Sequence, residues 1–410
     1  MARIYPFEAY RYAPAAGPLD TLVTQPYDKI SPAMRERYLA LNPHNLVRII
    51  LGETRAQDSA ADNVYTRAAA LLEEWTRNGV LVRDPAPGFY IYSQEFTLPG
   101  TGERFTRRGF IGLGALEEYS AKVVHRHEQT LTGPKKDRME LLRHTRAHFG
   151  QIFMLYPDAE GKAEAILEEA SAGGAAAEVV DEYGVTHRLW VAATPEVTGR
   201  LQAAMSDKKL LIADGHHRYE TALSFYKENG NVVGADRVMM TFVNMYSPGL
   251  KILATHRVVS GVEGFEPGAM LRATGAREAG SLGEIAELFR KPKPERMRMG
   301  VAVPGGRFYV IDRARKAGEL DVQVLHREIL AGQLGISEEA VREERCLRYV
   351  RGLEEAAGLV EKGEAQAAFL LEPVTVEQVA EVAFSGGVMP QKSTDFYPKL
   401  LSGMTVYKLG

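Results

Sequence analysis

The sequence predicts a mixed α/β (α+β) fold, and three observations support that prediction. Residues 209–230 have the pattern of a strand, a tight turn and a helix. Two alternating segments flank the turn-forming residues 98–102, which is typical of an antiparallel hairpin. An amphipathic helical pattern covers residues 62–80. Because hairpins accompany the strand–turn–helix unit, the sequence does not predict a purely parallel, doubly wound sheet.

The remaining elements follow in chain order. Ser31-Pro32 suits the N-cap and first position of a helix over 32–41, and the helix within 62–80 ends at Asn78-Gly79. The later elements are a helix from Glu160 to Ala177 interrupted at Gly173-Gly174, a hairpin over 175–192, strands over 237–247 and 250–259, helices over 321–335 and 337–363, a strand over 365–374 and a helix capped by Thr375 and Gln378. We expect three domains, covering residues 1–155, 156–310 and 311–410.

Composition excludes several classes of protein. Lys plus Arg (50) nearly balances Asp plus Glu (53), so the net charge of −3 gives no general attraction to nucleic acid. No apolar run approaches 18 residues, so we expect no membrane span, and the N-terminus lacks a signal-peptide pattern. The single cysteine, Cys346, lies in the predicted helix over 337–363 and has no second cysteine to pair with. We expect a cytoplasmic protein, for which a homo-oligomer is compatible with the sequence.

The densest group of reactive side chains lies in the turn after the strand at 210–213. Asp214 follows that strand, Gly215 permits a tight turn, and His216, His217 and Arg218 begin the helix. A helix start favours anions, and an arginine can bind phosphate through two nitrogens. We expect Asp214 to be a base or a Mg²⁺ ligand, although an N-cap aspartate with solvated basic neighbours would give the same pattern.

Two further segments add polar groups. The segment HRHEQTLTGPKKDRMELL offers Glu128 as a base and Lys135, Lys136 and Arg138 as phosphate ligands. The segment GGVMPQKSTDFYPKLLSGM offers Lys392 for phosphate, with Ser393 and Thr394 near a metal, although it does not match the Walker pattern. An exposed charged loop and a helix-capping loop are the alternative interpretations of these two segments.

A histidine pair suggests a different class of site. His144 and His148 are four residues apart in a predicted helix beginning near Asp137, a spacing that binds zinc when a third ligand is supplied from elsewhere. Arg143 and Arg146 flank the pair and disfavour a nearby cation.

These segments together resemble a bacterial and archaeal family known only as domain of unknown function number one thousand and fifteen. The resemblance extends from residue 25 to about 403, and its motifs are QPYDKI, NLVRI, HEQTLTGPKKDR, VTHRLW, IADGHHRYETAL, THR and MPQKSTDFYPKL. The DGHHR turn is also similar to the phosphate motif of the ParB/sulfiredoxin-like superfamily, whose members include sulfiredoxin, CTP-binding partition proteins and an archaeal free serine kinase.

The second resemblance implies a ParB/sulfiredoxin-like nucleotide-binding core with added hairpins and a helical C-terminal part. It implies that residues 215–218 hold nucleotide phosphates while Asp214 is positioned for catalysis. Sulfiredoxin's turn cysteine is replaced here by histidine, which argues against sulfinic-acid repair. The DNA-reading helix-turn-helix of the partition proteins is not apparent either.

We therefore expect a nucleotide-binding protein, and specifically a Mg²⁺-dependent kinase that uses ATP or ADP to phosphorylate a small hydroxylated substrate such as free serine. In that hypothesis Asp214, His217 and Glu128 are catalytic. The phosphates are bound by Gly215, His216, Arg218, Lys135, Lys136, Arg138, Lys392, Ser393 and Thr394, and Asp214 holds the metal. The alternatives are a nucleotide-dependent regulatory switch without kinase activity and a metal-dependent hydrolase built on the histidines.

Overall fold

The computed structural model describes residues 1–128 and 133–410, and it confirms the mixed α/β class. The chain divides into two compact units. Unit 1 comprises Met1–Arg126, the described part of Thr130–Lys251, and Pro398–Gly410, whereas unit 2 comprises His127, Glu128 and Ile252–Tyr397. The predicted three-part division stays a prediction, and its two internal boundaries fall within strands β8 (Ile152–Tyr156) and β17 (Arg307–Ala314).

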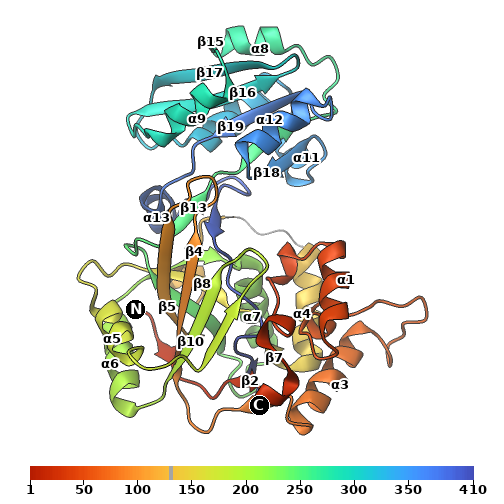
Figure 1. Ribbon diagram of the computed structural model, residues 1–410, viewed down its shortest axis with the longest axis vertical. Helices are drawn as coiled ribbons and strands as arrows, with labels where there is room; N and C mark the ends of the chain where they lie inside the picture. The colour runs from red at the N-terminus through yellow and green to blue at the C-terminus, as the bar shows by residue number, and fades with distance from the viewer. Residues whose placement is uncertain (129–132) are drawn as a thin grey trace. The chain divides into compact units, whose positions relative to one another are not determined.

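Unit 1 is built on a nine-stranded mixed sheet in the order β6-β11-β8-β12-β5-β4-β10-β9, with β1 paired to β5 (Figure 1). Its strands are β1 (Ile4–Tyr5), β4 (Phe89–Thr97), β5 (Arg104–Ala115), β6 (Val124–His125), β8, β9 (Ala177–Val180), β10 (Thr186–Ala192), β11 (Leu210–Asp214) and β12 (Arg237–Asn244). Both predicted hairpins are confirmed, because β4 pairs with β5 and β9 with β10, each antiparallel. The pairs β11–β6 and β12–β8 are parallel, which makes the sheet mixed.

Seven helices in the described part of unit 1 accompany this sheet: α1 (Pro32–Leu41), α2 (Val47–Ile50), α3 (Val64–Arg77), α4 (Gly133–Thr145), α5 (Lys162–Ala170), α6 (Pro195–Met205) and α7 (His216–Glu228). The predicted N-cap at Ser31 is confirmed, since its hydroxyl accepts a hydrogen bond from the backbone of Met34. The main core joins the sheet to α5, α6 and α7 through buried side chains such as Ile166, Leu201 and Tyr219. This packing fixes the start of α7 against the end of β11.

Short ladders complete unit 1. β2 (Tyr10–Tyr12) pairs with β3 (Leu81–Arg83), and β7 (Ala147–His148) pairs with β21 (Tyr407–Lys408). Through β21 the chain's last residues, drawn in dark blue in Figure 1, lie within unit 1.

Unit 2 has its own six-stranded sheet in the order β15-β17-β16-β19-β14-β18. The strands are β14 (His256–Val259), β15 (Arg277–Ala279), β16 (Arg296–Val303), β17, β18 (Leu347–Val350) and β19 (Ala367–Leu371); a separate ladder joins β13 (Lys251–Leu253) to β20 (Asp395–Tyr397). The helices are α8 (Pro267–Ala273), α9 (Leu282–Arg290), α10 (Asp321–Val324) continued by a π-helix (Leu325–Ala331), α11 (Glu338–Arg342), α12 (Leu353–Glu361) and α13 (Val376–Phe384). Ile285, Ala356 and Leu370 are among the residues of its separate core.

The predicted helix over 337–363 is wrong in its middle. Cys346 is not helical, and the next residue begins strand β18, which pairs with β14. Buried Leu347 and Val350 anchor that strand, so tertiary pairing outweighs the helical propensity of the charged residues around it. The capping box of Thr375 and Gln378 is confirmed at the start of α13. No helix among the described residues is long and apolar enough to cross a membrane.

Candidate functional site

The predicted strand–turn–helix is present at residues 210–228. Leu210 to Ala213 are buried in β11, Asp214 ends the strand, and α7 begins at His216. Gly215 has φ +96°, a backbone conformation that L side chains rarely adopt. A Cβ at Gly215 would also lie 3.1 Å from the guanidinium of Arg218, so this turn favours glycine both by conformation and by space.

Asp214 is the centre of an ionic cluster. Its Oδ2 lies 2.7 Å from Nη2 of Arg218, and its Oδ1 lies 3.1 Å from Nζ of Lys399. Burial alone would raise the pKa of Asp214, but the charges of Lys399, Arg218 and Lys29 outweigh it and lower that pKa well below its ordinary value. The carboxylate is therefore ionised at neutral pH, although only 23% of its side chain is exposed.

A small cavity of about 70 Å³ lies beside Arg218. Tyr27, Arg138 and Thr221 also line it, and the Arg138 guanidinium lies 4.3 Å from the centre of the Tyr27 ring. The hydroxyl of Thr221 is buried and has no hydrogen-bond partner among the described residues. Two guanidinium groups and an unsatisfied hydroxyl around one cavity suit a ligand that accepts hydrogen bonds.

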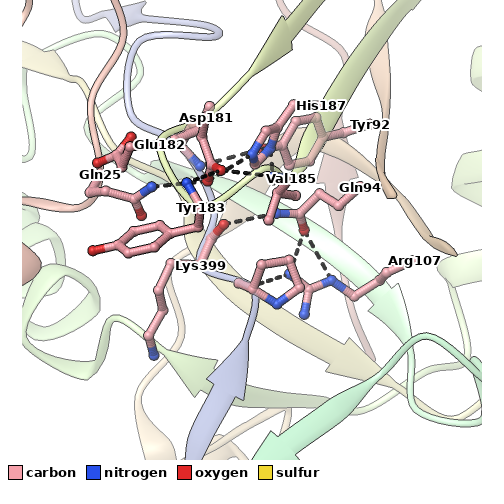
Figure 2. A network of polar contacts seen from close by, with 12 residues as sticks. Gln25, Tyr92, Gln94, Arg107, Asp181, Glu182, Tyr183, Val185, His187 and Lys399 are labelled. Carbon is pink, nitrogen blue, oxygen red and sulfur yellow. Dashed lines mark hydrogen bonds and ion pairs between the residues drawn. The ribbon is translucent and has the colours of Figure 1, made fainter. Parts of the chain in front are cut away.

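Lys399 is positioned through its backbone, as Figure 2 shows. Gln94 donates from Nε2 to the carbonyl of Lys399 at 2.8 Å, while its Oε1 accepts from Nε of Arg107 at 3.0 Å. Arg107 also donates to the carbonyl of Pro398 at 2.5 Å. Burial lowers the pKa of Arg107 to about 9, and its guanidinium lies 4.6 Å from the centre of the Phe153 ring. Gln94 and Arg107 come from β4 and β5, so the central sheet fixes the segment that carries Lys399.

A second group of hydrogen bonds supports the same segment through Tyr92 of β4, which in turn contacts His187 of β10 (Figure 2). The hydroxyl of Tyr92 lies 2.6 Å from Nδ1 of His187 and accepts from the backbone of Leu401 at 3.3 Å. Nε2 of His187 lies 3.3 Å from Oδ2 of Asp181, which also accepts from Gln25 at 3.1 Å. Burial lowers the pKa of His187 despite Asp181, so a neutral imidazole that accepts from Tyr92 and donates to Asp181 fits both contacts.

The other predicted residues of unit 1 have different surroundings. His216 is buried and His217 is half-buried in the first turn of α7. Lys135 forms an ion pair with Glu220 of α7, and Lys136 is exposed. Arg138 donates to the carbonyl of Ile50 and to Asp137, in addition to lining the cavity. Residues 129–132 of the HEQTLTGPKKDR motif lie outside the described residues.

Four predicted site residues belong to unit 2. Oε1 of Glu128 accepts from the hydroxyl of Thr394 at 3.4 Å, and His127 contacts that hydroxyl at 2.7 Å. Lys392 is exposed at φ +55°, and Ser393 is buried and donates to the carbonyl of Pro390. The structure thus brings Glu128 and Thr394 together within unit 2, and a shared site with Asp214 stays a prediction.

Sequence reasoning missed Lys29 and Lys399, the two lysines that act on Asp214. Both lie inside motifs of the sequence, QPYDKI and MPQKSTDFYPKL, but in the second motif the hydroxyl residues after Lys392 favour that lysine instead. His187 lies in VTHRLW, whose buried hydrogen bonds were likewise not foreseen. The available signal for Lys399 was its place directly after Pro398, because a proline has a fixed φ and so restricts the backbone that carries the lysine.

The donor set around Asp214 does not fit a protein-held Mg²⁺. Mg²⁺ prefers an octahedron of oxygen ligands, whereas both oxygens of Asp214 contact cationic nitrogens. The described residues contain no group of three or more His, Cys, Asp or Glu side chains that could hold a metal ion.

The structure also contradicts the prediction that His144 and His148 lie on one helix. His144 lies in α4, but Arg146 adopts φ +50° and ends the helical path, so His148 lies in β7 and stacks on Tyr407. The two imidazoles therefore do not share a helix face, and the zinc interpretation of their spacing is wrong.

Together the fold and the cluster define a mixed α/β protein with a cationic site at the start of a helix. A family model described as a protein of unknown function, DUF1015, matches residues 4–329, and the chain belongs to this family. The family predicted from the motifs is thus confirmed. None of the curated proteins matches the sequence.

Several solved structures are similar to this chain at low identity. A conserved hypothetical protein from Pyrococcus furiosus is 16% identical, with a TM-score of 0.34, and the match covers 67% of this chain and 87% of that one. A free serine kinase mutant in complex with AMP is 14% identical, with a TM-score of 0.37 over 67% and 83% of the two chains. SbnI with a C-terminal truncation, from Staphylococcus aureus, is 10% identical, with a TM-score of 0.37 over 71% and 85%.

Proposed function

We propose that this chain is a nucleotide-dependent phosphotransferase that uses ATP or ADP to phosphorylate a small hydroxylated substrate such as free serine. The observation that carries the proposal is the cluster of Lys399, Asp214 and Arg218 at the start of α7. The free serine kinase mutant named above is in complex with AMP, and a second structure of that kinase mutant is in complex with ADP. At TM-scores below 0.4 that likeness carries no argument, so the proposal rests on the residues of unit 1.

The start of α7 suits a phosphate for two physical reasons. No side chain caps this helix, whereas Ser31, Asn63 and Thr194 cap α1, α3 and α6. The N-cap residue is Gly215, which has no side chain to occupy the helix start, and the helix dipole favours an anion there. The three charges that lower the pKa of Asp214 are all positive, so a polyphosphate can share Lys399 and Arg218 with that carboxylate.

The low pKa of Asp214 bears on its role. A general base works best when its pKa lies near the operating pH, and the pKa of Asp214 is far below that. We therefore assign Asp214 to positioning Lys399 and Arg218, with His217 contacting the transferred phosphoryl group. Glu128 stays the predicted base.

In this proposal Mg²⁺ is bound by the nucleotide phosphates rather than by Asp214. Mg²⁺ is commonly bound through substrate phosphates and one or two carboxylates, and it would neutralise phosphate charge there. Ser393 and Thr394 stay predicted neighbours of this ion, and Lys135, Lys136, Arg138 and Lys392 stay predicted phosphate ligands.

Phosphoryl transfer by the purified full-length chain tests the proposal. The chain is incubated with ATP or ADP, Mg²⁺ and free L-serine or other small alcohols, and ³¹P NMR follows the phosphorylated product. We expect transfer by the natural chain, none by His217→Ala, and unchanged transfer by the control His144→Ala, whose imidazole is exposed on α4. If no phosphorylated product forms with either nucleotide, or if His217→Ala transfers as well as the natural chain, the proposal fails.

One observation favours the second candidate, a nucleotide-dependent switch. Lys399 follows the end of unit 2, Tyr397, by only two residues, so a ligand that moves Lys399 pulls on the chain leaving that unit. Nucleotide binding that changes hydrogen exchange in β20 without turnover of any alcohol would favour the switch over the kinase.

A further inference from the structure

Unit 2 contains a cavity of about 350 Å³, which is within the size range of small-molecule sites. Ser393 belongs to its lining, but none of Asp214, Arg218 and Lys399 does. Residues from several elements line it, among them Thr255, Arg257, Arg315, Leu320, Asp321 and Glu372. The lining thus combines an apolar part with charged groups of both signs.

Two carboxylates form the acidic part of this cavity. Asp321 begins α10 and lies 2.6 Å from Arg315, and Glu372 follows β19 and lies 2.5 Å from Arg298 of β16. These distances are measured to Oδ1 of Asp321 and Oε1 of Glu372, two buried oxygens that each already face one guanidinium. A carboxylate oxygen has two lone pairs, so each carboxylate can still accept a further N–H donor from a ligand.

The pKa values of these carboxylates agree with a shortage of positive charge. Burial raises the pKa of Glu372 to about 7 although Arg298 and Arg315 act against it, and Asp321 raises it further. Burial likewise raises the pKa of Asp321, with Arg315 opposing. The two arginines therefore do not fully compensate the cost of burying the two carboxylates.

Arg257 forms the basic part. Its side chain is 99% buried, and it donates to the carbonyls of Thr255, Gln391 and Lys392. Nε of Arg257 has no hydrogen-bond partner, and no carboxylate in the described chain forms an ion pair with this guanidinium, although Glu128 acts on it electrostatically. A buried guanidinium without an ion-paired carboxylate favours an anionic group on a ligand.

We propose that this cavity binds a small molecule that carries a primary ammonium group and a carboxylate, the chemistry of an amino acid. Its ammonium group lies between Asp321 and Glu372, and its carboxylate lies toward Arg257. Thr255, Thr375 and Ser393 supply hydroxyls for a polar side chain, and Leu320 and Val322 supply apolar contacts.

Isothermal titration calorimetry of the full-length chain tests this site. The probes are the twenty standard α-amino acids and γ-aminobutyrate, each at pH 7 in two buffers of different ionisation enthalpy. We expect at least one probe to bind and to release part of a proton, because an ammonium group lowers the pKa of Glu372 from about 7. Removing the ammonium by N-acetylation, or the carboxylate by using the decarboxylated amine, is expected to weaken binding at least tenfold.

Amino-acid substitutions test whether this cavity, rather than the Asp214 cluster of unit 1, binds the probes. Asp321→Asn and Glu372→Gln are expected to weaken binding at least tenfold, and Glu372→Gln removes the proton release. The matched control Glu377→Gln changes an exposed residue of the same cavity lining and is expected to change binding less than twofold. The proposal is overturned if no probe binds, if both carboxylate variants bind normally, or if Lys399→Met abolishes binding.

Discussion

Nζ of Lys399 lies 3.1 Å from Oδ1 of Asp214, which joins the end of β11 to a residue 185 positions later in the chain. Arg218 contacts the other oxygen of the same carboxylate. Asp214 therefore holds two cations of unit 1 within reach of one another, and removing either cation leaves the charge of Asp214 less compensated.

Lys399→Met is expected to weaken ATP or ADP binding at least tenfold in calorimetric titration. The substitution removes a positive charge beside Asp214 and leaves a carboxylate that repels phosphate. Lys227→Met, at the other end of α7 with a side chain 58% exposed, is the matched control and is expected to bind normally. Equal affinities for both variants would exclude Lys399 as a phosphate ligand.

Asp214→Asn is expected to lower the free energy of unfolding at pH 7 by about 1–3 kcal/mol, because the partly buried ion pairs with Lys399 and Arg218 are lost. The folded-state pKa of Asp214 is lowered, so its contribution is fully present above the ordinary value of 3.8 and is lost as pH falls through the folded value. Urea unfolding of both proteins at pH 7 and at pH 3 measures the effect, and the difference between them should shrink at the lower pH.

Tyr92→Phe tests the hydrogen bonds that position residues 398–401. The ring is kept, but the backbone N–H of Leu401 loses its contact with the Tyr92 hydroxyl, and the buried Nδ1 of His187 keeps only its 3.5 Å contact with Gln94. We expect unfolding to become easier by about 1–3 kcal/mol. Tyr183→Phe, at a tyrosine that is 57% exposed, should change stability by less than about 0.5 kcal/mol.

The burial of His256 predicts that the protein becomes less stable in acid. Its Nδ1 accepts from the backbone of Leu371 at 3.2 Å, and burial lowers the pKa of His256 to about 4. The unfolded chain binds a proton near pH 6.5 whereas the folded chain does not until about pH 4, so stability falls as pH drops between those values. The loss amounts to about 3 kcal/mol when complete.

His256→Asn keeps an acceptor near Nδ1 but does not titrate. Chemical denaturation at pH 7 and pH 4.5 is expected to show a smaller pH dependence in this variant, even if its stability at pH 7 is lower. An unchanged pH dependence would assign the acid sensitivity to other groups, such as His148 or His326, whose pKa values burial also lowers.

Local patterns in the sequence predicted the elements well where the pattern and the packing agree. The strand ending at Asp214, the turn at Gly215 and the capping box of Thr375 all depend on neighbouring residues, and all three are present. The strand over Leu347–Val350 was missed because its stabilisation comes from pairing with β14, about 90 residues earlier in the chain.

The candidate site was predictable only in part for the same reason. Arg218 follows Asp214 by four residues, so the local motif placed both in one group, although their ion pair was not predicted. Lys399 reaches Asp214 only because Gln94 and Arg107 hold the carbonyls of residues 398 and 399, and no local pattern encodes that contact. Lys392 was preferred for its hydroxyl neighbours, yet the side chain of Lys392 is exposed.

The insertion of unit 2 before Pro398 has a consequence for synthesis. A ribosome completes β11 and α7 early, but it must translate all of residues 252–397 before Lys399 exists. At about 5–20 residues per second this delay lasts roughly 7–30 s. During that interval Asp214 has Arg218 and Lys29 as positive neighbours but lacks Lys399, so the cluster is complete only after Lys399 has been translated.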